Sequence, residues 1–242
     1  MDQVLNLRTS DLPVLCQACE SRHRGVCSAL EPPLLAALAK ASSKRKVCAG
    51  SELVGESEAV VGYSNVLSGV VKLSKTLPDG RQQIVGLQFA PDFIGRPFKC
   101  ESALNAEAAT DVSLCSFPKS VMDRMISQSP GVEHRLLEQT LKELDDARDW
   151  MVTLGRKTAA ERIATFLLLI ARNIDPSARP DRRSASFTLP LMRADIADFL
   201  GLTIETVSRQ ITKLRADNVI QVEDNRHVTV TDMARLSARA GS

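Results

Sequence analysis

The sequence predicts an α+β protein with an N-terminal antiparallel β-roll, a long helix and a C-terminal winged helix-turn-helix. Three observations support this fold class. Short alternating strands between glycines and prolines fill residues 47–118. A long charged helix with apolar residues at heptad spacing follows over about 132–154. Two short amphipathic helices joined by a glycine occupy residues 192–217.

Composition and charge argue against a secreted protein, a membrane protein and a uniformly basic nucleic-acid coat. The chain has 242 residues, 44% hydrophobic and 25% charged, which is typical of a globular protein with room for two domains. The N-terminal residues have no signal-peptide core and no run is long enough for a membrane span, so we expect a cytoplasmic protein with no membrane partner. Net charge is only +2, but residues 151–242 carry 14 Lys and Arg against 10 Asp and Glu. A mildly basic C-terminal part fits a DNA-binding module.

The segment before the strands and the strands themselves are predicted from spacing. Apolar residues recur at helical spacing between residues 29 and 46, so we expect a helix there. Alternating runs such as Val70–Leu73, Gln83–Leu87 and Val112–Phe117 follow, and Pro78-Asp79-Gly80 is a strong turn signal between two of them. Many short strands without intervening helices predict an antiparallel β-roll.

The long charged helix has the features of a weak coiled coil. Its apolar residues at heptad spacing are Leu137, Leu141, Leu144 and Met151. Arg148 interrupts this seam, and a polar residue in a seam weakens and tunes association. We therefore expect these five residues to form a dimer seam. The alternative is an amphipathic helix that packs on its own domain.

The start of the C-terminal part has clear boundary signals. Thr158 and Glu161 form a capping-box pattern at the beginning of an apolar helix, Ala159–Arg172. Asp175–Ser186 is predicted to be a loop, because it is rich in Pro, Arg and Ser.

The helix-turn-helix is predicted from its turn and its two helices. A helix over Arg193–Leu200 should end at Gly201, because glycine adopts the left-handed conformation cheaply. Thr203 is a good N-cap for the second helix. The apolar residues of that helix recur at spacings of three and four and are expected to pack inward: Ile204, Val207, Ile211 and Leu214.

The polar face of the second helix and the strands after it indicate DNA binding. Short polar and forked side chains near the N-terminal end of such a helix suit base edges in a major groove. We therefore predict DNA contacts from Thr203, Glu205, Ser208, Arg209 and Thr212. Two short strands, Val219–Val222 and His227–Val230, should form a β-wing. An ordinary helical hairpin with a solvated face is the alternative.

Three cysteines near the N-terminus suggest a metal site. Cys16, Cys19 and Cys27 form a C-x2-C-x7-C pattern, and disulfides are rare in the expected compartment. Three interpretations remain open. An iron–sulfur cluster needs a fourth thiolate from elsewhere. Zinc could bind Cys16, Cys19, His23 and Cys27. The cysteines could also be free thiols.

The order of cysteine arm, β-roll, long helix and winged helix-turn-helix resembles the CRP–FNR superfamily of bacterial transcription factors over nearly the full chain. The most specific matches are Gly201–Arg209 (GLTIETVSR), with its Glu-x-x-Ser-Arg signature, and the cysteine set, which resemble the oxygen-sensing FNR branch of α-proteobacteria. The arm departs from the best-known spacing in its longer second interval.

The resemblance implies a mechanism. One [4Fe-4S] cluster per subunit would be held by Cys16, Cys19, Cys27 and, late in the β-roll, Cys115. It would promote a homodimer that binds double-stranded DNA at an inverted repeat resembling TTGAT…ATCAA, and oxygen would destroy the cluster and release the DNA. Family position further implies an RNA polymerase contact at the Lys75–Arg81 turn. The strand position of Cys115 also favours it over Cys48 and Cys100, because strands fix a ligand better than loops.

The resemblance also organises the chain and defines the alternatives. It implies a cluster arm over 1–28, a cyclic-nucleotide-binding-like β-roll over 29–131, a dimerisation helix over 132–156 and a DNA-binding domain over 157–242. A cyclic-nucleotide receptor would resemble Gly-Glu followed by Arg-Ser or Arg-Thr, and Phe93–Thr110 has no such pair, so we expect no cyclic nucleotide. A zinc arm or another small ligand remains the alternative. We expect no enzyme, because the three histidines are scattered.

Overall fold

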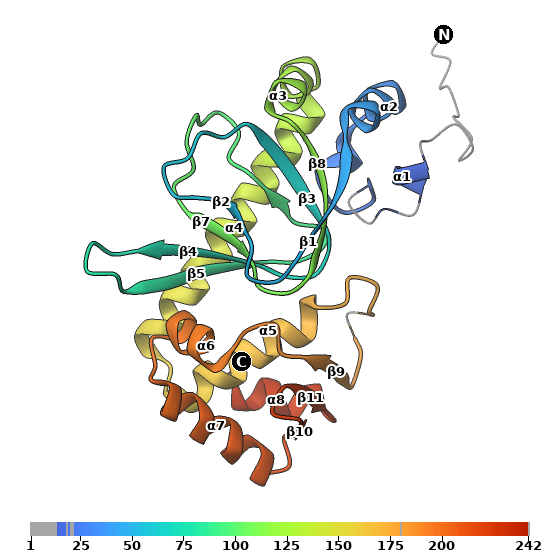
Figure 1. The fold of residues 1–242 in the computed structure, drawn as a ribbon. Coiled ribbons are helices and arrows are strands. Elements are labelled where there is room, and N and C mark those ends of the chain that lie inside the picture. Colours follow the sequence, from blue (N-terminus) through green and yellow to red (C-terminus); the bar gives the residue numbers. More distant parts are fainter. Residues whose placement is uncertain (1–13, 18, 20–21, 180, 242) are drawn as a thin grey trace.

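The computed structural model describes residues 14–17, 19, 22–179 and 181–241. The β-roll lies above the helical C-terminal part in Figure 1, and the long helix α4 (Pro130–Arg156) runs alongside both. This arrangement is the α+β fold class that the sequence predicts.

The β-roll consists of two four-stranded antiparallel sheets, with strand orders β1-β8-β3-β6 and β2-β7-β4-β5. Glycine at 80, with a positive φ of 86°, closes the turn between β4 and β5, as the Pro-Asp-Gly signal predicted. The strands are β1 Ser43–Val47, β2 Glu52–Val54, β3 Gly62–Ser68, β4 Val71–Thr76, β5 Gln82–Gln88, β6 Phe93–Ile94, β7 Asn105–Ala108 and β8 Val112–Pro118.

Short helices flank the roll at both ends. The predicted helix over 29–46 is too long: α2 starts at Pro32, whose ring suits a first helical position, and residues from Ser43 pair with β8 instead. The basic residues Lys44–Lys46 are therefore in strand β1 and not in the helix. The sequence prediction did not include the helix α3 before α4. The helical elements are α1 Val14–Gln17, η3 Val26–Ala29, α2 Pro32–Ala41 and α3 Lys119–Gln128.

The C-terminal part contains the predicted winged helix-turn-helix. Gly201 has a left-handed φ of 61°, and the Thr158–Glu161 capping box is formed. The predicted loop over 175–186 is wrong at its end, because Ala185 begins a third wing strand paired with β11. The helix α8 was not predicted. The elements are α5 Ala159–Asn173, β9 Ala185–Thr188, α6 Arg193–Leu200, α7 Ile204–Ala216, β10 Ile220–Glu223, β11 His227–Val230 and α8 Met233–Arg239.

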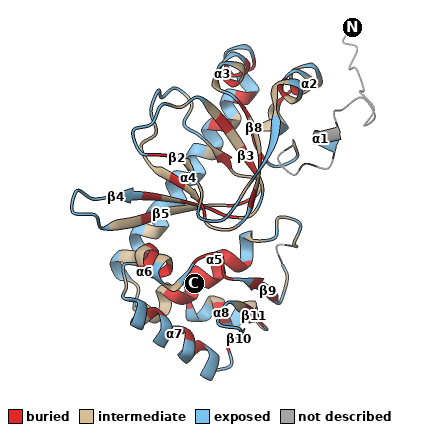
Figure 2. Cartoon of the chain, viewed as in Figure 1, coloured by how far each residue is buried: buried red, intermediate tan, exposed pale blue. Residues whose placement is uncertain are grey.

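One hydrophobic core crosses from the β-roll into the C-terminal part. Its centre is the buried α5, red in Figure 2. Val70, Ile84 and Phe89 of the roll belong to the same cluster as Phe199 of α6. The base of the β4–β5 hairpin therefore packs directly on the helix-turn-helix. Among the described residues, no helix is both long and apolar enough to cross a membrane.

Candidate functional site

The helix α7 presents a polar face to solvent. All five residues predicted to contact DNA are exposed: Thr203, Glu205, Ser208, Arg209 and Thr212. Val207, Ile211 and Leu214 are buried, as the apolar spacing predicts. The prediction that Ile204 packs inward is wrong, because 47% of this residue is exposed. It is the first residue of α7, where the chain has just left the core at the turn.

Local hydrogen bonds fix the start of α7. The Thr203 hydroxyl accepts from the backbone amide of Thr206 at 3.3 Å, which makes it the N-cap. The pKa of the Glu205 carboxyl is lowered, first by its own backbone amide and then by the Thr203 hydroxyl. Glu205 is therefore an acceptor at neutral pH. The exposed guanidinium of Arg209 makes a long 3.5 Å contact from Nη2 to the Thr206 hydroxyl.

The wing lies beside the start of the helix-turn-helix. Its turn has positive φ angles at Asp224 and Asn225, both tolerant of that conformation. Arg193, the first residue of α6, donates from Nη2 to the Asn225 carbonyl oxygen at 3.1 Å. The wing and the first helix thus form one surface next to α7.

The predicted seam of α4 is exposed in this chain. Leu137, Leu141, Leu144 and Met151 have between 44% and 72% of their surface exposed. Arg148 is also exposed and pairs with Asp145 at 3.1 Å. The alternative, that this face packs on its own domain, is therefore wrong for these residues. Val132 and Leu136, at the start of α4, are the ones buried against the β-roll side.

Four cysteines line one small cavity between the arm and the β-roll. Cys16, Cys19 and Cys27 come from the arm and Cys115 from β8, together with Asn65 of β3. The cavity measures about 20 Å³. His23, the fourth ligand of the zinc interpretation, is exposed and does not line it. Within the part of the chain that the structure describes, no three Cys, His, Asp or Glu residues are placed to hold a metal ion.

Three of the thiols that line this cavity, those of Cys16, Cys27 and Cys115, have raised pKa values. Burial raises the pKa of Cys27 to about 12, although the hydrogen bond from Asn65 Nδ2 to its Sγ, 3.3 Å long, lowers it. The charges of Cys115, Cys19 and Cys16 raise it further. Burial also raises the pKa of Cys16 and of Cys115. Charge on a neighbouring sulfur raises the pKa of each of these three thiols, so they share one electrostatic environment.

A much larger cavity lies in the β-roll. It measures about 680 Å³. Most of its lining comes from the apolar interior of the roll, and its charged residues are Arg45, Glu58, Arg96 and Glu143.

Comparison with known proteins identifies the family. The chain is 54% identical to a "Probable transcriptional activator" of Rhizobium leguminosarum bv. viciae, over 93% of this chain and 92% of the relative. It is 43% identical to "Transcriptional activator protein FnrL" of Cereibacter sphaeroides, again over 93% and 92% of the two chains. This chain belongs to the Crp/Fnr family of transcriptional activators. The Crp/Fnr assignment makes the winged helix-turn-helix a DNA-binding module.

Domain and structure comparisons agree with the Crp/Fnr assignment. The "Cyclic nucleotide-binding domain" family matches residues 44–129, and the "Crp-like helix-turn-helix domain" family matches residues 161–239. The solved structure of FixK2 from Bradyrhizobium japonicum aligns with a TM-score of 0.75 at 32% identity, covering 83% of this chain and 98% of FixK2. Both halves of the fold are therefore those of the family.

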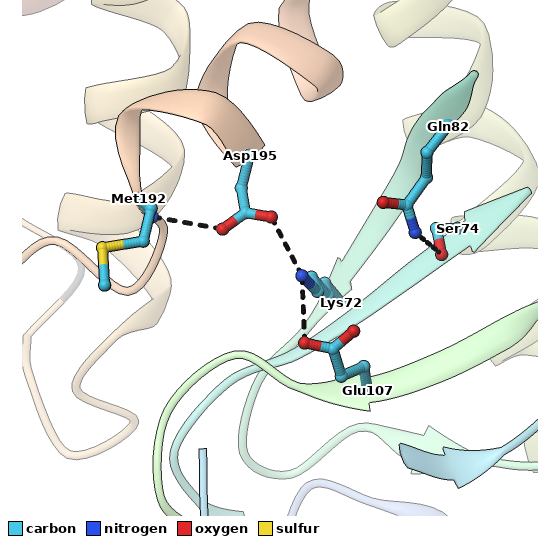
Figure 3. A network of polar contacts seen from close by, with 6 residues as sticks. All are labelled: Lys72, Ser74, Gln82, Glu107, Met192 and Asp195. Atoms are coloured by element: carbon cyan, nitrogen blue, oxygen red, sulfur yellow. Dashed lines mark hydrogen bonds and ion pairs between the residues drawn. The ribbon is translucent and has the colours of Figure 1, made fainter. Parts of the chain in front are cut away.

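Two buried polar residues of this Crp/Fnr protein escaped sequence reasoning. Lys72 bridges β4 to α6 in Figure 3, and Asn65 reaches the cysteine cavity. A signal existed for Lys72, since it is the one charge in the apolar run Val70–Leu73. Asn65 had no such signal, because its role depends on a chain segment 38 positions away.

Proposed function

We propose that this Crp/Fnr protein is an oxygen-responsive activator that holds a [4Fe-4S] cluster and, as a homodimer, binds an inverted repeat in double-stranded DNA. The observation that carries the proposal is the cysteine cavity. It brings Cys115 of β8 to the three cysteines of the arm and leaves His23 outside. A set of four thiolates suits an iron–sulfur cluster.

The donor set fits the cluster, and the cavity must open to admit it. A volume of about 20 Å³ holds roughly one water molecule. The arm carrying Cys16, Cys19 and Cys27 would move outward, while Cys115 stays fixed by its pairing with β1 and β3. When bound, the cluster supplies the oxygen-reactive centre. The residues of the chain supply four sulfurs, which must lose their protons to bind.

Hydrogen bonds link the arm to the rest of the protein. Arg135 of α4 donates from Nη2 to the Arg24 carbonyl oxygen at 2.5 Å. Arg24 in turn donates from Nη1 to the carbonyl oxygen of Pro176, in the loop after α5, at 2.8 Å. Movement of the arm would therefore act on both the dimer helix and the DNA-binding part. A local binding event then has a global effect.

The dimer would form through the exposed seam of α4, and its two α7 helices would bind two half-sites. A two-fold dimer matches an inverted repeat. Arg209 suits guanine O6 and N7, Glu205 can accept from cytosine N4, and Ser208 can contact a neighbouring base. The exposed β4–β5 turn, Lys75–Arg81, is proposed as the RNA polymerase contact. The relative FnrL is named a transcriptional activator, which supports activation rather than repression for this chain.

Anaerobic purification tests the proposal. We expect a broad absorption band at the edge of the visible range, about four irons and four sulfides per chain, and tight binding to an inverted TTGAT repeat. Exposure to air should remove the band and the DNA binding together. Protein that contains zinc, lacks sulfide and binds DNA equally in air would contradict the proposal.

The 680 Å³ cavity of the β-roll supports a second candidate function, a regulator that responds to a small molecule. A ligand there would meet two arginines and two glutamates, Arg45, Arg96, Glu58 and Glu143. In that case DNA binding would be indifferent to iron and air. The same anaerobic experiment therefore separates the two candidates.

A further inference from the structure

Lys72 is a buried lysine that forms an ionic bridge between the β-roll and the helix-turn-helix. The side chains of its partners Glu107 and Asp195 are 33% and 22% exposed. Lys72 lies on β4 and is only 8% exposed. Its Nζ is 2.9 Å from Oδ1 of Asp195, on α6, and 3.0 Å from Oε1 of Glu107, its cross-strand neighbour on β7. Figure 3 shows the ammonium between the two carboxylates.

The β4–β5 hairpin holds α6 at both ends. At the start of α6, Asp195 accepts from Lys72 with Oδ1 and from the Met192 amide with Oδ2, at 3.3 Å. At the end of α6, Gln83 of β5 donates from Nε2 to the Phe199 carbonyl oxygen at 3.3 Å. Apolar residues of the roll share one hydrophobic cluster with the buried residues of α6. Two separated polar contacts around an apolar centre define the orientation of a helix better than the apolar contact alone.

The bridge is sensitive to the loss of any interdomain partner. A buried charge left without its partner is strongly unfavourable, whereas an exposed pair contributes little. Asp198 lies close enough for Lys72 to lower the pKa of its carboxyl, although burial and then Asp195 raise it overall. Without the ammonium, the carboxylates of Glu107, Asp195 and Asp198 would repel one another across the interface.

We propose that Lys72 is a positioning residue that fixes the orientation of the helix-turn-helix and thereby the half-site spacing that the dimer accepts. This inference rests on the proposed function in requiring a dimer bound to an inverted repeat. Half-sites lie about 34 Å apart, so one added base pair moves a half-site by roughly 3.4 Å and rotates it around the duplex. A rigid connection between α6 and the roll rejects such a shift, and a loose connection tolerates it.

The test measures spacing preference by fluorescence anisotropy, with anaerobically purified full-length protein. The probes are inverted repeats with the optimal spacing and with one base pair removed or added. The wild type should bind the optimal spacing at least about tenfold more tightly, which is the loss that one mismatched base pair typically causes. Lys72→Met and Asp195→Asn should reduce this ratio to about two or less. Asparagine keeps an oxygen for the Met192 amide, so the second variant removes the bridge and preserves the helix cap.

Two variants serve as matched controls. Glu107→Gln removes the partner within the roll and leaves the Lys72–Asp195 pair. Lys75→Met removes an exposed lysine of β4, the strand that also carries Lys72, and its pair with Glu56 lies within the roll. The polymerase contact proposed for Lys75 has no part in this assay, which contains protein and DNA alone. Both should keep the wild-type ratio.

The outcomes separate the two claims. If the wild type prefers one spacing and Lys72→Met and Asp195→Asn keep that preference, the positioning role is overturned and the proposed function stands. If Glu107→Gln and Lys75→Met lose the preference as fully as Lys72→Met, the bridge has no special role and the inference is also overturned. A wild-type protein without any preference for an inverted repeat would overturn both.

Discussion

Asn65 donates a hydrogen bond from Nδ2 to the sulfur of Cys27 across 3.3 Å. The amide is 1% exposed, and its Oδ1 has no hydrogen-bond partner among the described residues. A buried amide whose oxygen has no partner costs free energy, and the hydrogen bond to the sulfur satisfies the other half of the group. This contact ties the cysteine arm to the centre of the β-roll.

The raised pKa of Cys27 predicts slow alkylation. The thiolate is the nucleophile, and a pKa of about 12 leaves almost none of it at pH 8. In metal-free protein treated with iodoacetamide and analysed by mass spectrometry, the exposed Cys48 and Cys100 should be modified first and Cys27 last. Asn65→Val should slow Cys27 further, because the amide that lowers the pKa of this thiol is removed and the pKa therefore rises. The Cys27 rate should rise with pH up to about 12; a rate equal to that of Cys100 at pH 8 would contradict the burial of this thiol.

Arg209 should carry sequence specificity. Arg209→Ala should cost about 1–3 kcal/mol on a specific site, because a bidentate contact to guanine is lost, and little on scrambled DNA. Gel-shift titrations on both DNAs measure this. Arg215→Ala is the matched control, since Arg215 is an exposed arginine in the last turn of the same helix. Equal losses on cognate and scrambled DNA would show that Arg209 contacts only phosphate.

Arg148 should limit the strength of the dimer. Its ion pair with Asp145 is exposed and contributes little, so a leucine there gains about 1.5–3 kcal/mol from burial in the seam. Sedimentation of Arg148→Leu in air should show more dimer than the wild type. Arg156→Leu, on the same helix but off the seam, should change nothing. A wholly monomeric Arg148→Leu protein would count against this seam.

Local signals predicted much of the fold, and tertiary pairing limited the rest. Thr158, Gly201 and Thr203 act through neighbours a few residues away, and the structure confirms all three. The strand β1 could not be predicted, because Lys44–Lys46 becomes extended only by pairing with β8, about 70 residues later. Ile204 was wrongly predicted to be buried, because helical spacing defines a face of the helix but not how far along that face the core extends.

The candidate sites also differ in whether local sequence or tertiary packing determines them. The polar face of α7 follows from spacing within one helix, so its exposure could be predicted. The meeting of Cys115 with the arm depends on how two distant segments pack. The family resemblance suggested it, and the strand position of Cys115 favoured it over the other two cysteines. Lys72 was missed because a lysine in a strand is usually solvated; its burial depends on the carboxylate that α6 brings to it.

The Thr158 cap should stabilise the DNA-binding part. Its hydroxyl accepts from the Glu161 amide, and Glu161 Oε2 accepts from the Thr158 amide at 2.7 Å. Thr158→Ala should lower the free energy of unfolding by about 1 kcal/mol, while Thr158→Ser should retain it, because serine keeps the hydroxyl. Urea unfolding followed by circular dichroism measures the difference. An alanine variant as stable as the serine variant would show that the cap contributes nothing.

The iron and sulfide content of cysteine variants tests the central claim most directly. Cys115→Ser and Cys100→Ser are reconstituted anaerobically side by side, with Cys48→Ser as a second control. Cys115→Ser should lose the cluster, the anaerobic dimer and specific DNA binding together, and the two controls should keep all three. A full complement of iron and sulfide on Cys115→Ser, or zinc bound in its place, would contradict the account.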